Sequence, residues 1–168
     1  MTAIPFVKSL SVTEARENAA WATCDVSKIP KGEVLLCGYA MIYHRTEKDK
    51  LLISKYTHLL SDPMSKNSKQ PDVALNKWRS EKEDYYIFRP WAPIRRCSVE
   101  FHKEYAYWYE APENEALKEL PYFTEVCEGR TWDMSGRLYQ RVGYPPEENL
   151  IVPNVKWVSE SRVLIYDG

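Results

Sequence analysis

Long apolar runs and glycine-rich motifs are missing from this sequence of 168 residues. A membrane-spanning helix needs about 18 consecutive apolar residues, and no such run occurs, so we expect no contact with a membrane. The six glycines are scattered and form neither a Walker-type loop nor a G-x-G-x-x-G motif, which argues against a site that cradles phosphate groups. Residues 1–6 also lack the charged and apolar regions of a secretory signal.

Cysteine is sparse, and its spacing includes no C-x-x-C pair. The four cysteines are Cys24, Cys37, Cys97 and Cys127. A small disulfide framework normally shows more cysteines per residue, so we expect reduced, mostly buried thiols in a cytoplasmic protein. One or two disulfides are the alternative, with Cys97–Cys127 as one pairing.

Histidine is equally sparse and does not suggest a metal site. His44, His58 and His102 have neither the i, i+2 nor the i, i+4 spacing that places two ligands on one face of a strand or helix. No cysteine pair adds further ligands. The sequence therefore predicts no metal site and no cofactor, and the absence of a G-x-S-x-G motif gives no indication of a serine nucleophile.

The net charge is −1, but basic and acidic side chains are unevenly distributed along the chain. Residues 45–103 carry thirteen basic and eight acidic side chains, whereas residues 104–168 carry six basic and twelve acidic ones. If these segments stay apart in space, they create surfaces of opposite potential. The overall composition, 44% hydrophobic and 28% charged, is typical of a single folded domain.

Periodicity in the first half of the chain predicts one clear helix and two strands. The helix covers Ser11–Thr23 and begins with capping-box spacing. Glu33–His44 is nearly continuously apolar and predicts a central strand covered on both faces. A charged turn then joins it to a second strand, Leu51–Tyr56, as a hairpin. Residues 60–82 are rich in loop signals and predict a long mobile loop, with a short helix at Asp72–Arg79.

The second half of the chain alternates short strands with turns. The predicted strands are Tyr85–Arg89, Ile94–Glu110, Tyr122–Cys127, Leu150–Val152, Val155–Ser159 and Arg162–Tyr166, with a short helix at Pro112–Leu120 and a hairpin turn at Ser135-Gly136. Pro153 indicates an edge strand. The whole pattern predicts a β-rich α+β domain, in which the N-terminal helix packs on a curled antiparallel sheet or a partly open β-barrel.

The strand Ile94–Glu110 carries the candidate catalytic side chains. Glu100, His102 and Glu104 fall on one strand face if the register is unbroken. In the wall of a pocket, His102 could act as a general base that a glutamate orients. The simpler interpretation is a solvated face with charged residues in water, while the tyrosines of the opposite face turn inward.

Aromatic and basic residues form the candidate binding surface. Tyr, Trp and Arg dominate the hot spots of protein interfaces, and 13% of this chain is aromatic. The candidate binding residues are Tyr105, Tyr107, Trp108, Tyr109, Trp78, Arg95 and Arg96. Because adjacent residues of a strand point to opposite faces, the three consecutive rings at 107–109 cannot all be buried on one side.

We therefore expect a non-catalytic interaction module that binds a protein partner through an aromatic and charged surface. The first alternative is a small β-barrel enzyme or small-molecule binder with an acid–base pocket around His102, which a closed cavity of roughly 300 Å³ would favour. The second alternative is binding of single-stranded nucleic acid by residues 66–96, where basic and aromatic residues alternate. The domain as a whole lacks the strongly basic charge typical of nucleic-acid binding.

Overall fold

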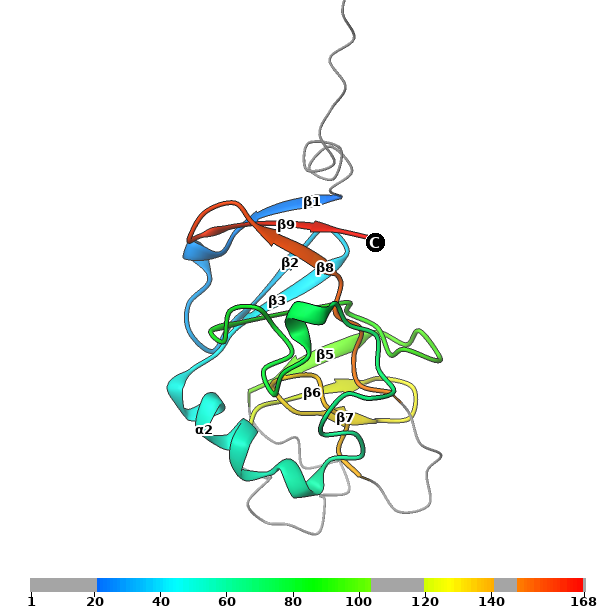
Figure 1. The fold of residues 1–168 in the computed structure, drawn as a ribbon. Helices are drawn as coiled ribbons and strands as arrows, with labels where there is room; N and C mark the ends of the chain where they lie inside the picture. Colours follow the sequence, from blue (N-terminus) through cyan, green and yellow to red (C-terminus); the bar gives the residue numbers. More distant parts are fainter. Residues whose placement is uncertain (1–20, 104–119, 141–147, 168) are drawn as a thin grey trace, which may run out of the picture.

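The computed structural model describes residues 21–103, 120–140 and 148–167, and within them nine strands form three antiparallel sheets. In spatial order, the first sheet contains β1 (Ala22–Asp25), β9 (Arg162–Tyr166) and β8 (Asn154–Trp157), the second β2 (Val34–Cys37), β3 (Ala40–His44) and β4 (Tyr85–Phe88), and the third β5 (Val99–His102), β6 (Tyr122–Glu125) and β7 (Thr131–Trp132). Figure 1 shows the sheets one above another, with helix α2 (Glu47–Lys55) beside the third. The prediction of a β-rich fold is confirmed, but no closed barrel forms among these residues.

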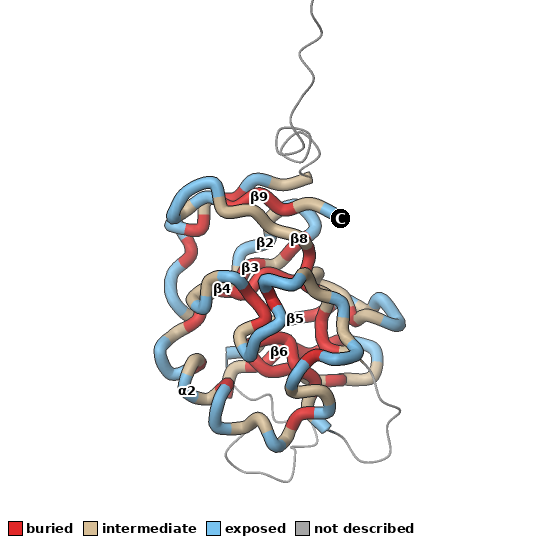
Figure 2. The backbone as a smooth tube through the Cα atoms, viewed as in Figure 1, coloured by how far each residue is buried: buried red, intermediate tan, exposed pale blue. Residues whose placement is uncertain are grey.

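The second sheet is covered on both faces because its strands send apolar side chains in both directions. Ile42 of β3 packs with Ile165 of β9 in one core, whereas the adjacent Tyr43 packs with Phe123 of β6 in the other. Figure 2 shows buried positions concentrated along the strands of these layers. The burial on both faces that the apolar run predicts is confirmed for β3.

The predicted strand Glu33–His44 is in fact a hairpin made of β2 and β3. Cys37 and Ala40 are the last paired residues, which leaves Gly38 and Tyr39 as a two-residue turn. Gly38 has a φ of +59°, as favoured two-residue hairpin turns require at their first central position. A Cβ atom at Gly38 would also lie only 2.7 Å from the Cβ of Ala22. Glycine at this position therefore divides the apolar run into two strands.

The predicted strand Leu51–Tyr56 is wrong, because these residues belong to helix α2 and the residue that follows it. A capping box starts the helix: Asp49 N donates to Thr46 Oγ1 at 3.1 Å, and Thr46 N donates to Asp49 Oδ2 at 2.7 Å. The hydroxyl of Tyr43 donates to the same carboxylate at 2.7 Å. The charged stretch after β3 is therefore a helix start and not a hairpin turn.

Several other predicted elements are confirmed in place. The strands expected at Tyr85–Arg89 and Tyr122–Cys127 correspond to β4 and β6, and β9 covers Arg162–Tyr166. The turn at Ser135-Gly136 is closed by a 2.8 Å hydrogen bond from Gly136 N to Asp133 O. Strand β8 follows Pro153 and lies at the edge of its sheet, as the proline indicates.

The long strand predicted over Ile94–Glu110 is shorter than expected. Residues 93–95 form a turn, and β5 begins only at Val99. The helix predicted at Asp72–Arg79 is a single 3₁₀ turn, Asp72–Ala74, and Leu150–Val152 forms no strand.

Parts of other predictions lie outside the described residues. These are residues 104–110 of the long strand, residues 112–119 of the helix Pro112–Leu120, and residues 11–20 of the helix Ser11–Thr23. The end of that N-terminal helix is wrong, because Ala22–Asp25 form strand β1.

Residues 60–82 contain little regular structure, but buried polar side chains hold them. The side-chain nitrogen of Asn149, a fully buried residue, donates to Asp62 O and to Ser65 Oγ, both at 2.9 Å. Arg79 Nη2 donates to Gln70 Oε1 at 2.8 Å. The mobility expected of this loop stays a prediction.

Arg45, which directly follows β3, is fully buried and uses every N–H of its guanidinium group. Its Nε donates to Met134 O at 3.1 Å, Nη1 to Glu83 O at 2.7 Å and Ser80 Oγ at 3.2 Å, and Nη2 to Trp78 O and to Ser135 Oγ at 3.2 Å. Burial lowers the pKa of Arg45 to about 10, so the side chain stays charged at neutral pH. One cation thus connects the 78–83 segment to the 134–135 turn.

Two further buried arginines reinforce the same region. Arg79 Nη1 donates to Gly136 O at 3.0 Å. Arg137 Nε donates to Asp133 Oδ2 at 2.9 Å, and Arg137 Nη2 donates to Ile53 O in helix α2 at 2.6 Å. A buried cation is tolerated only where charge partners and hydrogen-bond acceptors surround it. These arginines therefore fix the positions of the loops that supply their acceptors.

All four cysteines are paired, so the expectation of reduced thiols is wrong. Cys24–Cys37 joins β1 to β2, and Cys97–Cys127 joins the turn before β5 to the loop after β6. Cys24 is buried in the core, whereas Cys127 is exposed. Disulfides are rare in the cytosol and typical of oxidising compartments. The cytoplasmic location, which depended on reduced thiols, is not confirmed.

The described part of the chain contains no helix that is both long enough and apolar enough to cross a membrane.

Replacing Arg45 by methionine should destabilise the fold strongly. Arg45→Met removes the donors of several buried carbonyl and hydroxyl groups, and each such group left without a partner costs about 1–3 kcal/mol. We expect the free energy of unfolding, measured by urea denaturation, to fall by about 3 kcal/mol or more. The same substitution at the exposed Arg162 is the control and should change it by less than about 0.5 kcal/mol. Equal effects of the two substitutions would contradict the role of Arg45.

The two disulfides should differ in their sensitivity to reduction. Thiol–disulfide exchange requires access of the attacking thiolate to a sulfur atom, and of the two bridges only Cys97–Cys127 has an exposed cysteine. With rising dithiothreitol, we expect Cys97 and Cys127 to become alkylated first, while near-ultraviolet circular dichroism still shows a folded protein. Peptide mapping by mass spectrometry measures this order, and earlier labelling of Cys24 and Cys37 would contradict it.

Candidate functional site

The predicted acid–base pair of β5 forms only in part. Glu100 and His102 share one strand face, and Glu100 Oε2 lies 3.5 Å from His102 Nε2. The His102 ring stacks on Tyr122 with ring centroids 5.1 Å apart. Glu104 lies outside the described residues. Two hollows of about 290 and 250 Å³ indent the described surface, and His102 lines neither of them.

The predicted binding residues do not form one surface. Tyr105, Tyr107, Trp108 and Tyr109 lie outside the described residues. Trp78 packs against the core next to Arg45, and Lys77 Nζ lies 4.5 Å from its ring centroid. Arg95 and Arg96 are both exposed and follow one another in the turn before β5.

The basic and acidic segments of the sequence interleave in space. Lys82 Nζ lies 3.1 Å from Glu160 Oε2, Arg89 pairs with Asp167, and Arg95 pairs with Glu128. Each pair joins a cation of residues 45–103 to an acid of residues 104–168. The charge difference along the sequence is therefore neutralised locally at these three positions instead of forming two opposed faces.

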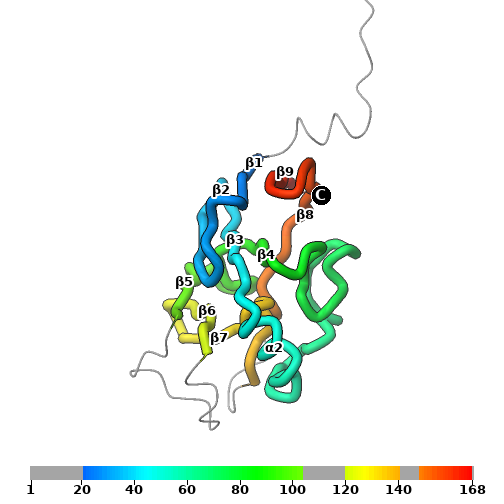
Figure 3. Tube along the Cα trace, turned by 90° about the vertical axis from the view of Figure 1, so that its left-hand side faces the viewer, coloured from blue at the N-terminus to red at the C-terminus, as the bar shows by residue number. Residues whose placement is uncertain are grey.

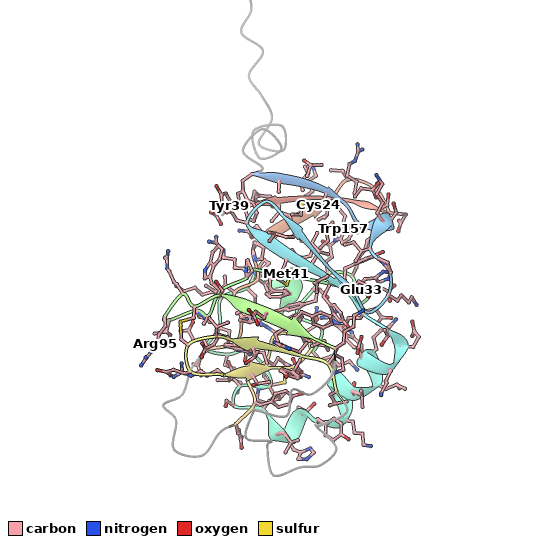
Figure 4. The ribbon with its side chains drawn as sticks, turned by 180° about the vertical axis from the view of Figure 1, so that it is seen from behind. Cys24, Glu33, Tyr39, Met41, Arg95 and Trp157 are labelled. Carbon is pink, nitrogen blue, oxygen red and sulfur yellow. A yellow bond between two sulfur atoms is a disulfide. The ribbon has the colours of Figure 1, made fainter. Side chains whose placement is uncertain are left out.

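A tight turn presents Arg95 and Arg96 to solvent. Ala92 N donates to Cys97 O at 2.8 Å, and Arg96 N donates to Ala92 O at 3.0 Å. Arg96 has a φ of +53°, a left-handed conformation that is unfavourable for most non-glycine residues. Ile94, in the same turn, is 58% exposed. Figure 4 shows Arg95 pointing away from the strands.

A second loop, held by the buried carboxylate of Glu125, lies beside this turn. Glu125 accepts hydrogen bonds from the backbone N–H groups of Cys127 at 2.5 Å, Glu128 at 3.0 Å and Arg130 at 3.2 Å. Val126, whose amide donates to Ser98 O at 3.3 Å, is 59% exposed. A carboxylate with several backbone donors fixes the course of a loop firmly.

The disulfide Cys97–Cys127 joins the two loops, with the Cα atoms 6.1 Å apart. The ion pair between Arg95 and Glu128 adds a second link. We call this unit, residues 92–97 and 126–128, the disulfide knob. Its exposed side chains are two apolar residues, Ile94 and Val126, and the two arginines. Among the described residues, Arg96 has no ion-pair partner.

The knob also contains three possible metal ligands, but their contacts do not suit a metal ion. The ligand atoms of Cys97, Glu125 and Cys127 lie within 4.8 Å of one another. Both sulfurs are bonded to each other, so neither is a thiolate. Both carboxylate oxygens already accept backbone hydrogen bonds. The prediction that the protein binds no metal is not tested by this arrangement.

Sequence analysis identified the arginines of the knob but not its apolar residues or its disulfide. The available signal was local: cysteines follow Ile94-Arg95-Arg96 and Val126 directly, and Pro90 and Pro93 precede the turn. The pairing itself depends on β5 and β6 lying side by side, which no local pattern specifies.

No protein-family model matches this chain, and no curated protein is significantly similar to it in sequence.

Proposed function

We propose that this protein is a non-catalytic interaction module that binds another protein through the disulfide knob. The observation that carries the proposal is the combination of exposed apolar side chains, Ile94 and Val126, with the exposed Arg95 and Arg96 on a rigid unit. Arginine flanked by apolar contacts is typical of interface hot spots.

The rigidity of the knob favours binding. Association normally loses free energy in ordering loops and side chains, and a preformed loop avoids part of that loss. Here the disulfide, the Glu125 carboxylate and the Ala92–Cys97 hydrogen bond order the backbone before any partner arrives. The knob can therefore present its side chains without a folding step.

The charges of the knob favour a partner with an acidic group. Arg95 already has a carboxylate neighbour in Glu128, whereas Arg96 has no ion-pair partner among the described residues. A partner carboxylate could pair with Arg96, with apolar side chains next to Ile94 and Val126. Because both disulfides suit an oxidising environment, we propose that this binding takes place outside the cytoplasm.

The alternative functions have less support in the structure. For an enzyme or small-molecule binder, Glu100 and His102 lie close together, but neither described hollow adjoins them. For single-stranded nucleic acid, the 66–96 segment places Arg79, Tyr86 and Phe88 in the interior. Lys82 and Arg89 are ion-paired there.

Substitutions in the knob should abolish partner binding without unfolding the protein. Loss of an interface hot spot costs about 2 kcal/mol or more, which corresponds to about a thirtyfold rise in Kd. We therefore expect the double variant Ile94→Asp/Arg96→Glu to lose the proteins that the wild type retains from a native extract. Quantitative mass spectrometry of the retained proteins measures this loss, and Kd is then measured for the strongest partner.

Two control variants make the test specific. Leu51→Asp changes an exposed apolar side chain on helix α2, far along the chain from the knob, and should retain the partner. His102→Ala should also retain it, because the proposed binding uses no acid–base chemistry. Loss of the partner in a folded His102→Ala variant, or its retention by the knob variant, would refute the proposal.

A further inference from the structure

Strand β8 leaves one of its edges open. Among the described residues it pairs only with β9, and Val158 N donates to Arg162 O at 3.0 Å just beyond the paired residues. Hydrogen-bonded pairs alternate along an antiparallel ladder, so Lys156 and Asn154 bond to β9. The N–H and C=O groups of Val155 and Trp157 therefore point away from β9, and their amides donate to no other described group.

An apolar hollow adjoins this open edge. Its volume is about 290 Å³, and its lining includes Val155 and Trp157 of β8, Tyr85 and Ile87 of β4, and Val73. The rings of Tyr85 and Trp157 lie 5.6 Å apart and form one wall. Figure 3 shows β8 between β9 and the green segment that contains residues 60–82. The hollow thus lies beside backbone groups that lack a partner.

Exposed side chains mark the rim of the hollow. Val73 is 51% exposed, and Lys82 Nζ lies 4.1 Å from the centroid of the Trp157 ring while pairing with Glu160. The rim is therefore apolar on one side and neutralised on the other. An occupant with a strong net charge would gain little here, whereas an apolar side chain would remove surface from water.

We propose that β8 accepts an extended segment of a partner protein as an added strand, with one apolar side chain of that segment in the hollow. Backbone pairing along a sheet edge supplies affinity in such complexes, and side-chain pockets next to the edge supply specificity. Val155 and Trp157 provide the backbone groups, and Tyr85, Ile87 and Trp157 provide the pocket. This site is separate from the knob, so it does not depend on the function proposed there.

A second copy of β8 does not fit the same place. The apolar side chains of a second β8, Val155 and Trp157, pack against the core of their own chain. The alternate residues, Asn154 and Lys156, are polar and do not suit an apolar hollow. Pairing of two β8 strands would leave both hollows unfilled. The occupant is therefore a segment with apolar side chains at alternate positions, supplied by another protein.

A displayed library of random twelve-residue peptides, selected against the full-length oxidised protein, tests this inference. We expect enriched peptides with apolar residues at alternate positions and no proline between them. Replacing the amides of an enriched peptide one at a time by N-methyl amides should weaken binding with a period of two. Only every second amide of an added strand faces β8, and loss of one hydrogen bond weakens binding up to about tenfold.

Variants of β8 provide the matched pair. Val155→Pro removes an amide that points away from β9, and Asn154 already has the extended conformation that precedes proline. It should weaken binding of the selected peptide about tenfold, whereas Val155→Thr, which keeps the amide, should bind it as the wild type does. The knob variant Ile94→Asp should also bind it normally.

Three results would overturn the inference: a library with no enriched peptide, equal binding to the proline and threonine variants, or an N-methyl series without a period of two. The N-methyl series uses only the wild-type protein, so it decides the question even if Val155→Pro does not fold.

Discussion

The fold depends on a buried cation at the end of β3. A guanidinium group inside a protein is stable only when its donors are satisfied, and Arg45 meets this condition with acceptors on two segments about forty and ninety residues further along the chain. The 78–83 segment and the 134–135 turn must therefore adopt one arrangement around it. Gly136 belongs to the same arrangement, since any Cβ there would lie 1.8 Å from the hydroxyl oxygen of Tyr86. Order in these irregular segments thus comes from polar contacts in the interior.

This origin of order explains which parts of the fold the sequence could predict. Apolar continuity correctly indicated that β3 is covered on both faces, and β9 matches its predicted limits. The buried arginines could not be recognised, because Arg45 differs from a surface cation only through acceptors such as Met134 O, 89 residues away. Helix α2 was missed for a different reason: Thr46 and Asp49 form a cap that resembles a charged turn. The disulfides depend on strand neighbours that no spacing rule identifies.

The candidate site was predictable to a similar extent. Arg95 and Arg96 were identified from residue type alone, since arginine is enriched at interfaces. Their rigidity comes from the Cys97–Cys127 bridge, and their apolar neighbours come from two different loops. The charge difference between the middle and the end of the chain suggested two opposed surfaces. Ion pairs such as Lys82–Glu160 instead join those segments, so at these positions local contacts matter more than segment charge.

The two proposed contacts differ in the part of the polypeptide that they offer. The knob offers side chains on a backbone whose hydrogen bonds are already made, so its specificity depends on charge and apolar shape. Strand β8 offers backbone groups, and its specificity depends on one hollow. The knob joins the third sheet and β8 belongs to the first, with the second sheet between them. Because that middle sheet is packed on both faces, it is a rigid spacer, and one molecule can hold two partners in a fixed relation to each other. A module with this geometry acts by bringing its partners together, which requires no catalytic group of its own.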